Sequence, residues 1–159
     1  MAFVDRDARE QLVTLVRSER VAALGTLRDG APLVSMVAYL DALELPVFYV
    51  HVSHLAWHTQ DMARDGRVSL MIAARDDGRA DPQTLARLSI RGDATRLPNE
   101  GPAHATLRDA FLARHPAAAI PLTLSDFHFW RITPREARFV AGFGRIHTLS
   151  AAELRARTP

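Results

Sequence analysis

The sequence predicts a mainly β protein, a small antiparallel barrel of about six or seven strands with peripheral helices. β-Rich runs follow one another in hairpin order, and the turn signal Asp29-Gly30 separates the first two runs. The regular alternation of strand and helix that characterises a doubly wound fold is missing, as is a Gly-x-Gly-x-x-Gly motif after the first strand. Closure into a barrel removes the exposed edges that so many strands would otherwise leave.

We expect strands over runs of β-forming residues that are bounded by turn residues. They cover residues 21–27, 32–40, 47–52, 68–74, 85–97, 127–132 and 137–140. A turn at Thr133-Pro134 is expected to join the last two strands. Gly142 and Gly144 predict a further backbone turn that a Cβ would obstruct.

Helices are expected before, between and after the strands. The first covers residues 5–19, where apolar residues recur at helical spacing. Two more are expected over residues 54–64 and within residues 99–115, the second of these with an apolar side directed to the core. A Ser-x-x-Glu capping box predicts a short last helix over residues 150–157. The barrel itself then occupies residues 20–149.

The length and composition indicate one globular domain over residues 1–159, because a chain of this size can bury a continuous core. No apolar run reaches the ~18 residues of a membrane helix, and the N-terminus has no basic segment followed by an apolar one. The absence of cysteine excludes disulfides, thiolate metal sites and cysteine catalysis. We therefore expect a cytoplasmic protein that does not bind a membrane.

The charged residues do not indicate a nucleic-acid partner. The formal net charge is +2 with neutral histidines, and the basic residues are arginines. Arginine suits bidentate contact with phosphate or carboxylate, but a GC-rich genome produces the same enrichment for no chemical reason. The arginines form no continuous stripe along the sequence, so nucleic-acid binding is disfavoured.

The segment Ser53–Thr59 is the most informative part of the chain because it joins a predicted strand to a predicted helix. A serine that opens a helix caps it, while further N–H groups remain free at the positive end of the helix dipole, where phosphate is stabilised. His54, His58 and Thr59 add hydrogen-bonding groups within the next turn. The pattern predicts a phosphate cradle; the alternative is that Ser53 is a plain helix cap and His58 a surface residue.

The order of these segments is similar to that of a known family. Ser-x-Leu-Ala-x-His-Thr at residues 53–59 is followed by Gly-Arg-Val-Ser-Leu-Met-Ile at residues 66–72, and later by residues 86–92, 111–116 and 142–145. Together they resemble the FMN-binding split barrel of the pyridoxamine 5′-phosphate oxidase-like superfamily. The similarity is greatest to its branch of HugZ-type haem-utilisation proteins, without the additional C-terminal domain of that branch.

The resemblance implies a homodimer in which FMN lies in a groove between the two protomers. Ser35 and His58 occupy positions where the oxidases have a phosphate-binding arginine and lysine, and Thr59 follows His58. Arg87 falls near a residue that contacts the isoalloxazine ring, and Ser53 caps the phosphate-binding helix. The implied function is a flavin-dependent oxidoreductase that acts on a small-molecule substrate. No residue of the sequence indicates a particular catalytic acid or base.

Other functions remain open at this stage. The same barrel can serve a haem-binding or haem-utilisation protein, in which His58, His128 or His147 ligates iron and an arginine holds a propionate. It can also be a dimerising module without a cofactor. The spacing of His51, His54 and His58 suggests a zinc site, but no further ligand stands in a recognisable motif, so no metal is expected.

Several candidate residues also have a purely structural interpretation. Ser35 is expected to be a solvated or barrel-facing strand residue if it binds no cofactor, and Arg87 an edge charge that prevents aggregation. Arg145 either reaches the cofactor groove or pairs with an acidic side chain. The aromatic residues of the predicted site region are expected in the core or at a subunit interface. They are Trp57, Phe127, Phe129 and Trp130.

Overall fold

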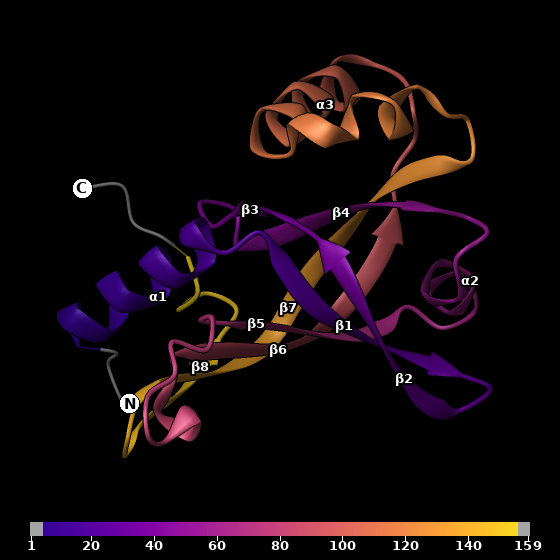
Figure 1. Cartoon of the computed structure of the whole chain (residues 1–159). Coiled ribbons are helices and arrows are strands. Elements are labelled where there is room, and N and C mark those ends of the chain that lie inside the picture. The colour runs from indigo at the N-terminus through magenta and orange to yellow at the C-terminus, as the bar shows by residue number, and fades with distance from the viewer. Residues whose placement is uncertain (1–4, 156–159) are drawn as a thin grey trace.

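Eight antiparallel strands form one continuous sheet in the computed structural model, which describes residues 5–155. The strands are β1 (Val21–Arg28), β2 (Ala31–Ala38), β3 (Leu40–Ala42), β4 (Val47–Ser53), β5 (Arg67–Ala73), β6 (Arg87–Arg96), β7 (Phe127–Gly142) and β8 (Arg145–Ser150). Their order in the sheet is β2-β1-β5-β6-β7-β4-β3, and β8 pairs with β7. The sheet curls into a split barrel (Figure 1), which confirms the predicted mainly β fold class.

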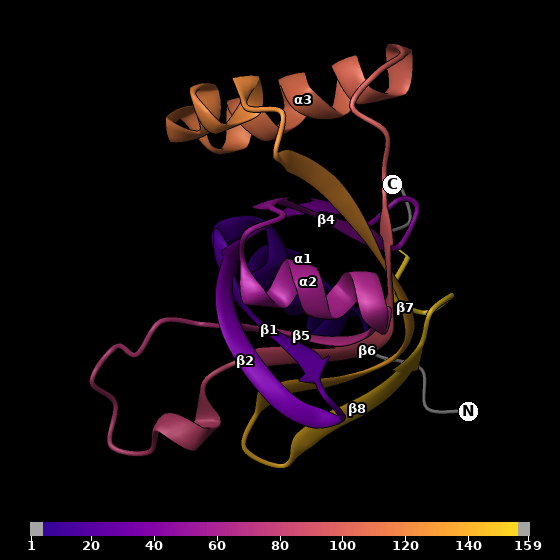
Figure 2. The ribbon, with the colours of Figure 1, turned by 90° about the vertical axis from the view of Figure 1, so that its right-hand side faces the viewer.

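Three helices accompany the sheet. They are α1 (Arg6–Ser18), α2 (Trp57–Arg64) and α3 (Pro102–Arg114), with short 3-10 turns η1 (Pro82–Thr84), η2 (Pro116–Ala119) and η3 (Pro121–Thr123). Figure 2 shows the sheet curving around α2, with α3 on the outside of the barrel. Among residues 5–155, none of the helices has the length and the apolar character that crossing a membrane requires.

The core lies inside the curl of the sheet and is closed at one side by α1. Four apolar residues of this helix are buried, as their spacing predicted: Ala8, Leu12, Leu15 and Val16. The hydroxyl of Tyr39 donates to the carbonyl of Val16 at 2.6 Å, so the one buried phenol beneath α1 has a partner. The predicted first helix is therefore confirmed.

The expected turn at Thr133-Pro134 is wrong, because β7 continues through it as one strand of 16 residues. Pro134 pairs with Gly92, and the register between β6 and β7 shifts between Arg91 and Gly92. A β-bulge of this kind accommodates a proline, which has no N–H for the ladder. A Cβ on Gly92 would lie 2.4 Å from the carbonyl oxygen of Thr133, so this close approach requires glycine.

The last strand, β8, was not expected from the sequence. Gly142 and Gly144 have φ angles of 149° and 72°, and they form the predicted turn between β7 and β8. After β8, Ser150 and Glu153 form the reciprocal hydrogen bonds of the predicted capping box. The segment that follows is a hydrogen-bonded turn, not a helix. Residues 156 and 157 of the predicted last helix lie outside the described residues.

Helix α3 differs from the expectation in its environment. The sequence predicted a helix with an apolar side directed to the core, but Phe111 is its one buried residue. The helix lies beside β3 and outside the barrel (Figure 1). Phe111 packs against the rings of His51 and Phe129, with centroids 5.8 and 5.4 Å away. A small aromatic cluster therefore attaches α3 to the outer side of β4 and β7.

We expect Gly92→Ala to lower the free energy of unfolding by about 1 to 3 kcal/mol, because the added methyl group meets the backbone of β7. Urea denaturation followed by circular dichroism measures the change. Ser89→Ala, at an exposed position of the same strand, is the control and should change the value by less than about 0.5 kcal/mol. Equal stability of the two variants would contradict the bulge as the reason for glycine.

Candidate functional site

Helix α2 is held against the barrel by a buried carboxylate. Asp61 is completely buried, and its two oxygens accept hydrogen bonds from Oγ1 of Thr26 at 2.9 Å and from Nη1 of Arg28 at 3.0 Å. The Arg28 guanidinium also lies over the ring of Trp57, 4.1 Å from its centroid. Strand β1 therefore supplies both partners of the carboxylate. These contacts fix the orientation of α2 and of the other side chains that it carries.

Ser53 does not cap α2, so this prediction is wrong. The helix begins at Trp57, and its N-cap residue Ala56 offers no side-chain hydrogen bond. Ser53 is the last residue of β4, where its hydroxyl donates to Oδ2 of Asp126 at 2.6 Å and accepts from the backbone N–H of Leu55 at 3.1 Å. Pairing of β4 with β7 extends as far as Ser53, which brings it to Asp126 and away from the helix.

His58 and Thr59 lie in the first turn of α2, as predicted, but they are less accessible than a surface cradle requires. Thr59 is 4% exposed and His58 is half-buried. Within the described residues, neither Oγ1 of Thr59 nor Nε2 of His58 has a hydrogen-bond partner. Burial lowers the pKa of His58, so its imidazole is neutral over more of the pH range. Unpartnered polar atoms in such positions are uncommon and indicate a ligand or a bound water.

A cavity of about 510 Å³ lies between α2 and the ends of β4, β6 and β7, and we call it the α2 cavity. Thr59 lines it together with His54, Arg96, His128 and Trp130. Trp130 is 5% exposed, and its indole Nε1 has no hydrogen-bond partner within residues 5–155. The remaining lining residues are Val52, Gln60, Met62, Ala63, Ala94 and Thr95.

A second candidate surface lies on the opposite side of the sheet, and we call it the outer face. It consists of four large apolar residues of β1, β2 and β5 that are 41–77% exposed: Val21, Val34, Met36 and Met71. A shallow depression of about 330 Å³ lies among them. Exposed apolar residues gathered in this way are unusual on a monomer and mark an interaction surface.

Ser35 lies at this depression, between the exposed Val34 and Met36 of β2. It is half-buried and pairs with Leu24 of β1. Residues opposite each other in a ladder project from the same side, so the side chain of Ser35 projects with that of the buried Leu24, toward the side on which α2 packs and away from Val34 and Met36. None of the described residues that line the depression is an arginine or lysine of the kind that binds phosphate in the oxidases.

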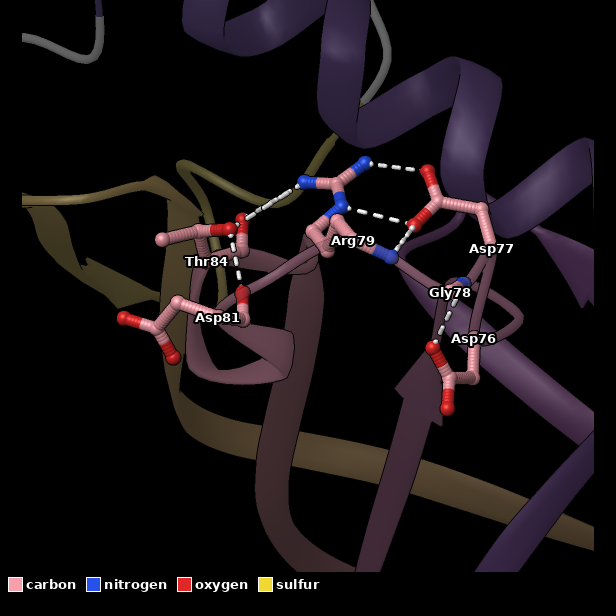
Figure 3. A network of polar contacts seen from close by, with 6 residues as sticks. All are labelled: Asp76, Asp77, Gly78, Arg79, Asp81 and Thr84. Atoms are coloured by element: carbon pink, nitrogen blue, oxygen red, sulfur yellow. Dashed lines mark hydrogen bonds and ion pairs between the residues drawn. The ribbon is translucent and has the colours of Figure 1, made fainter.

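Arg87 is positioned by the loop that precedes β6. In this loop, Arg79 forms an ion pair with Asp77 at 2.7 Å and also contacts Thr84 (Figure 3). Hydrogen bonds from Arg79 hold the pKa of Asp77 at about 2. Nη1 of Arg87 donates to the carbonyls of Gln83 and Leu85 at 2.7 and 3.1 Å.

The interpretation of Arg87 as an edge charge is wrong, because β6 lies between β5 and β7. In the register of the sheet, Arg87 is opposite Ala73 and Arg91 is opposite Ser69. Residues opposite each other in a ladder project from the same side. The two arginines therefore flank the outer face on the side of β6, with Ser89 opposite Met71 between them.

Arg145 pairs with acidic side chains of α1. Its Nη2 lies 2.8 Å from Oδ2 of Asp7 and 3.4 Å from Oδ1 of Asp5. The second of the two interpretations of Arg145, pairing with an acid, thus describes its contacts in the structure. The pair is exposed, so its contribution to stability is small.

The histidines are distributed over separate environments. His51 packs against the rings of Phe111, Phe127 and Phe129, and burial lowers its pKa to about 4. His128 lines the α2 cavity. His147 lies on β8 opposite Phe139 of β7, and its Nε2 has no hydrogen-bond partner among the described residues. Within residues 5–155, no three histidine or acidic side chains are grouped so that they could hold a metal ion.

The predicted residues thus do not form one pocket. Thr59 lines the α2 cavity, Arg87 lies at the outer face, Ser35 projects to the opposite side of the sheet with Leu24, and Ser53 is bonded to Asp126. The sequence did not indicate Arg96 as a site residue, and it assigned Trp130 to packing. No local motif marks either residue, because the cavity arises only where the ends of three strands meet α2.

Comparison with known proteins gives a consistent picture. The family described as CREG, β-barrel matches residues 6–155. The Non-canonical heme oxygenase HOZ, chloroplastic, of Arabidopsis thaliana is 34% identical over 137 residues, which are 84% of this chain and 40% of that protein. The chain therefore spans about two fifths of the length of this curated relative.

Solved structures with the same fold include haem and pyridoxamine phosphate proteins. A haem-binding protein from Mycobacterium smegmatis superposes with a TM-score of 0.83 and 31% identity over 96% of this chain and 61% of that one. ChuZ of Campylobacter jejuni has a TM-score of 0.80 and 20% identity, over 92% of this chain and 61% of that one. A putative pyridoxamine 5′-phosphate oxidase from Listeria innocua has a TM-score of 0.64 and 17% identity, over 84% and 98% of the two chains. The last two similarities show the fold alone.

We expect Arg28→Met to destabilise the protein by about 3 to 5 kcal/mol, because it leaves the completely buried carboxylate of Asp61 without its cation. The double variant Arg28→Met/Asp61→Leu should recover most of this loss. Urea denaturation measures both. Arg91→Met, which breaks the exposed pair with Glu136, is the matched control and should cost less than about 1 kcal/mol. Additive losses in the double variant would contradict the assigned role of the pair.

Proposed function

The chain belongs to the CREG β-barrel family, and from this premise we propose that it is a haem-binding split-barrel protein. The observation that carries the proposal is the outer face, an exposed apolar surface flanked by arginines. Two relatives that are more than 30% identical to this chain are named as a haem oxygenase and a haem-binding protein, which supports haem over other ligands.

The outer face suits the shape and polarity of haem. The porphyrin is a flat apolar ring with two carboxylates at one edge. Met36 and Met71 lie on β2 and β5, the two strands that flank β1, and both are opposite Ala23. The two methionines therefore form an apolar surface on either side of a small residue. Arg87 and Arg91 lie on β6, next to β5, and suit the propionates, because arginine binds carboxylates through paired N–H groups. Arg91 would exchange its exposed pair with Glu136 for a propionate.

The same face also contains side chains that ligate iron. A methionine thioether is a known axial ligand of haem iron, and Met36 and Met71 are 77% and 41% exposed. The histidines proposed from the sequence, His58, His128 and His147, lie away from this face, on α2, in the α2 cavity and beside Phe139. Bound haem would supply an iron centre for dioxygen chemistry, while this chain's residues bind, orient and cover the ring.

We further propose that the outer face is covered by a second copy of the chain. An exposed patch of four large apolar residues favours association, and a ring bound to a flat sheet leaves its second side open to water. A homodimer joined through β1, β2 and β5 would enclose the cofactor between two outer faces. This arrangement agrees with the groove between protomers that the sequence resemblance implied.

FMN is the second candidate cofactor, with an oxidoreductase activity on a small substrate. The observation that favours it is the pair of unpartnered atoms in the first turn of α2, Nε2 of His58 and Oγ1 of Thr59. Against it, Ser35 and His58 stand where the oxidases have a phosphate-binding arginine and lysine, so the two cationic contacts with the FMN phosphate are missing. In addition, the hydroxyl of Ser53 already donates a hydrogen bond to Asp126.

Titration of the purified protein with haemin should produce a saturable Soret band. Met36→Ala and Met71→Ala should each weaken haem binding about tenfold, because each removes apolar contact area and a candidate iron ligand. Ile120→Ala is the control, since Ile120 is 73% exposed but lies beside α3, away from the outer face. Flavin absorbance bands in place of a Soret band would favour FMN, and the absence of both would leave the dimerising module.

Sedimentation velocity tests the dimer. The wild-type protein should sediment as a dimer at micromolar concentration, and Met36→Glu should shift it to the monomer, because a charge in the outer face must be desolvated on association. Ile120→Glu introduces the same charge at another exposed apolar position and should leave the dimer intact. A monomeric wild-type protein with and without haem would contradict the proposed assembly.

A further inference from the structure

The geometry points to a second ligand site: the α2 cavity binds a small organic anion with a compact apolar body, separately from the cofactor at the outer face. Five of the residues that line the cavity carry hydrogen-bond donors: His54, Thr59, Arg96, His128 and Trp130. The outer face belongs to β1, β2 and β5, whereas the cavity lies among α2, β4, β6 and β7. The proposed haem function does not enter this argument.

Two buried polar groups in the cavity lack a partner within the described residues. Thr59 is 4% exposed and Trp130 is 5% exposed, and neither Oγ1 nor Nε1 accepts or donates a hydrogen bond. An indole Nε1 is a donor only, so the group that satisfies it must be an acceptor. Leaving such groups unsatisfied costs free energy that a bound acceptor would recover. The two atoms therefore favour a ligand with acceptor oxygens.

The one permanent charge among the described lining residues is positive, and the nearby carboxylates of Asp61 and Asp126 accept hydrogen bonds from Arg28 and Ser53. Arg96 is exposed at the end of β6, opposite Trp130 in the register with β7, and contributes a permanent positive charge. His54 and His128 are the other titratable residues of the lining, which contains no aspartate or glutamate from the described part of the chain. A cationic, donor-rich lining disfavours cations and neutral donors and favours carboxylate or phosphate groups.

The rest of the lining is mostly apolar and indicates the body of the ligand. Val52, Met62, Ala63 and Ala94 form the apolar part, and Gln60 and Thr95 are the other two lining residues. A volume of about 510 Å³ lies within the range of pockets that bind small molecules. An inorganic anion would leave most of these walls in contact with water. A carboxylate or phosphate carried by a small ring or chain would use both parts of the cavity.

Anion binding should also respond to pH through His128. Burial, Arg96 and His54 lower the pKa of His128, with a smaller lowering by His104 of α3, while Asp126 raises it. A bound anion opposes the lowering and raises the pKa, so binding is accompanied by uptake of a proton. Affinity should therefore increase as the pH falls through the pKa of the complex, and the slope should be smaller in His128→Gln, in which His54 is the remaining titratable residue of the lining.

The indole N–H resonances provide a direct readout, because the chain has two tryptophans, Trp57 and Trp130. Titration with benzoate and with phenylphosphate should shift the Trp130 signal saturably in ¹⁵N-HSQC spectra, while the 60% exposed Trp57 serves as internal reference. Acetate and inorganic phosphate should bind at least about tenfold more weakly, because they lack the apolar body. The neutral analogue benzamide should leave the signal unchanged.

Two variants and one matched control distinguish specific anion binding in the α2 cavity from a general effect of the net charge of the protein. Arg96→Gln should weaken benzoate binding about 10- to 100-fold, the effect of losing a charged hydrogen bond. Arg108→Gln removes the same charge from an exposed position of α3 and should leave the affinity unchanged. Thr59→Val should weaken binding while the free protein remains as stable or becomes more stable, since the buried hydroxyl is unpartnered.

Several results would overturn the inference. One is the absence of a saturable Trp130 shift with all four anions in the wild-type protein. Another is an equal loss of benzoate affinity in Arg96→Gln and Arg108→Gln, which would show that only the net charge of the protein matters. Loss of haem binding in Arg96→Gln would assign the cavity to the cofactor. A less stable Thr59→Val variant with unchanged anion affinity would make the hydroxyl a structural group.

Discussion

The arrangement of the α2 cavity depends on the buried contact between Asp61 and the barrel wall. A completely buried carboxylate is unfavourable unless it is paired and hydrogen-bonded, and Arg28 and Thr26 of β1 provide both functions. The contact determines which side of α2 faces β1, so Thr59 and Met62 face the space near β6 and β7. Without this anchor, an eight-residue helix with no side-chain cap would have little intrinsic stability.

The two sides of the sheet have different roles. In β1, β2 and β5, alternate residues enter the core, but several of the outward residues are also large and apolar. A strand that is apolar on both sides is typical of a sheet that is covered on both sides. The outer face therefore suits a flat apolar ligand and a second copy of the chain. The α2 cavity on the other side is donor-rich and suits an anion, so the two surfaces select different chemistry.

Part of the candidate site was predictable from the sequence. The strand-to-helix segment at residues 53–59 was recognised from its pattern, and Thr59 does line a cavity with an unpartnered hydroxyl. The role of Ser53 as a helix cap was wrong, because its hydroxyl is bonded to Asp126, 73 residues further along the chain. Arg96 and Trp130 could not be identified as site residues, since they belong to strands with no motif and meet α2 only after the barrel closes.

The sequence by itself determined the mainly β class, the first helix, the β1–β2 hairpin and the family resemblance. The first three features depend on periodicity and turn chemistry within a few consecutive residues, whereas the resemblance depends on the order of motifs between residues 53 and 145. The tertiary structure alone decided that β7 passes through Pro134, that β8 joins the sheet and that α3 lies outside the core. It also decided which polar groups are satisfied and which remain free to bind a ligand. Such outcomes follow from contacts between distant segments, whose energies depend on burial and on geometry that local sequence does not encode.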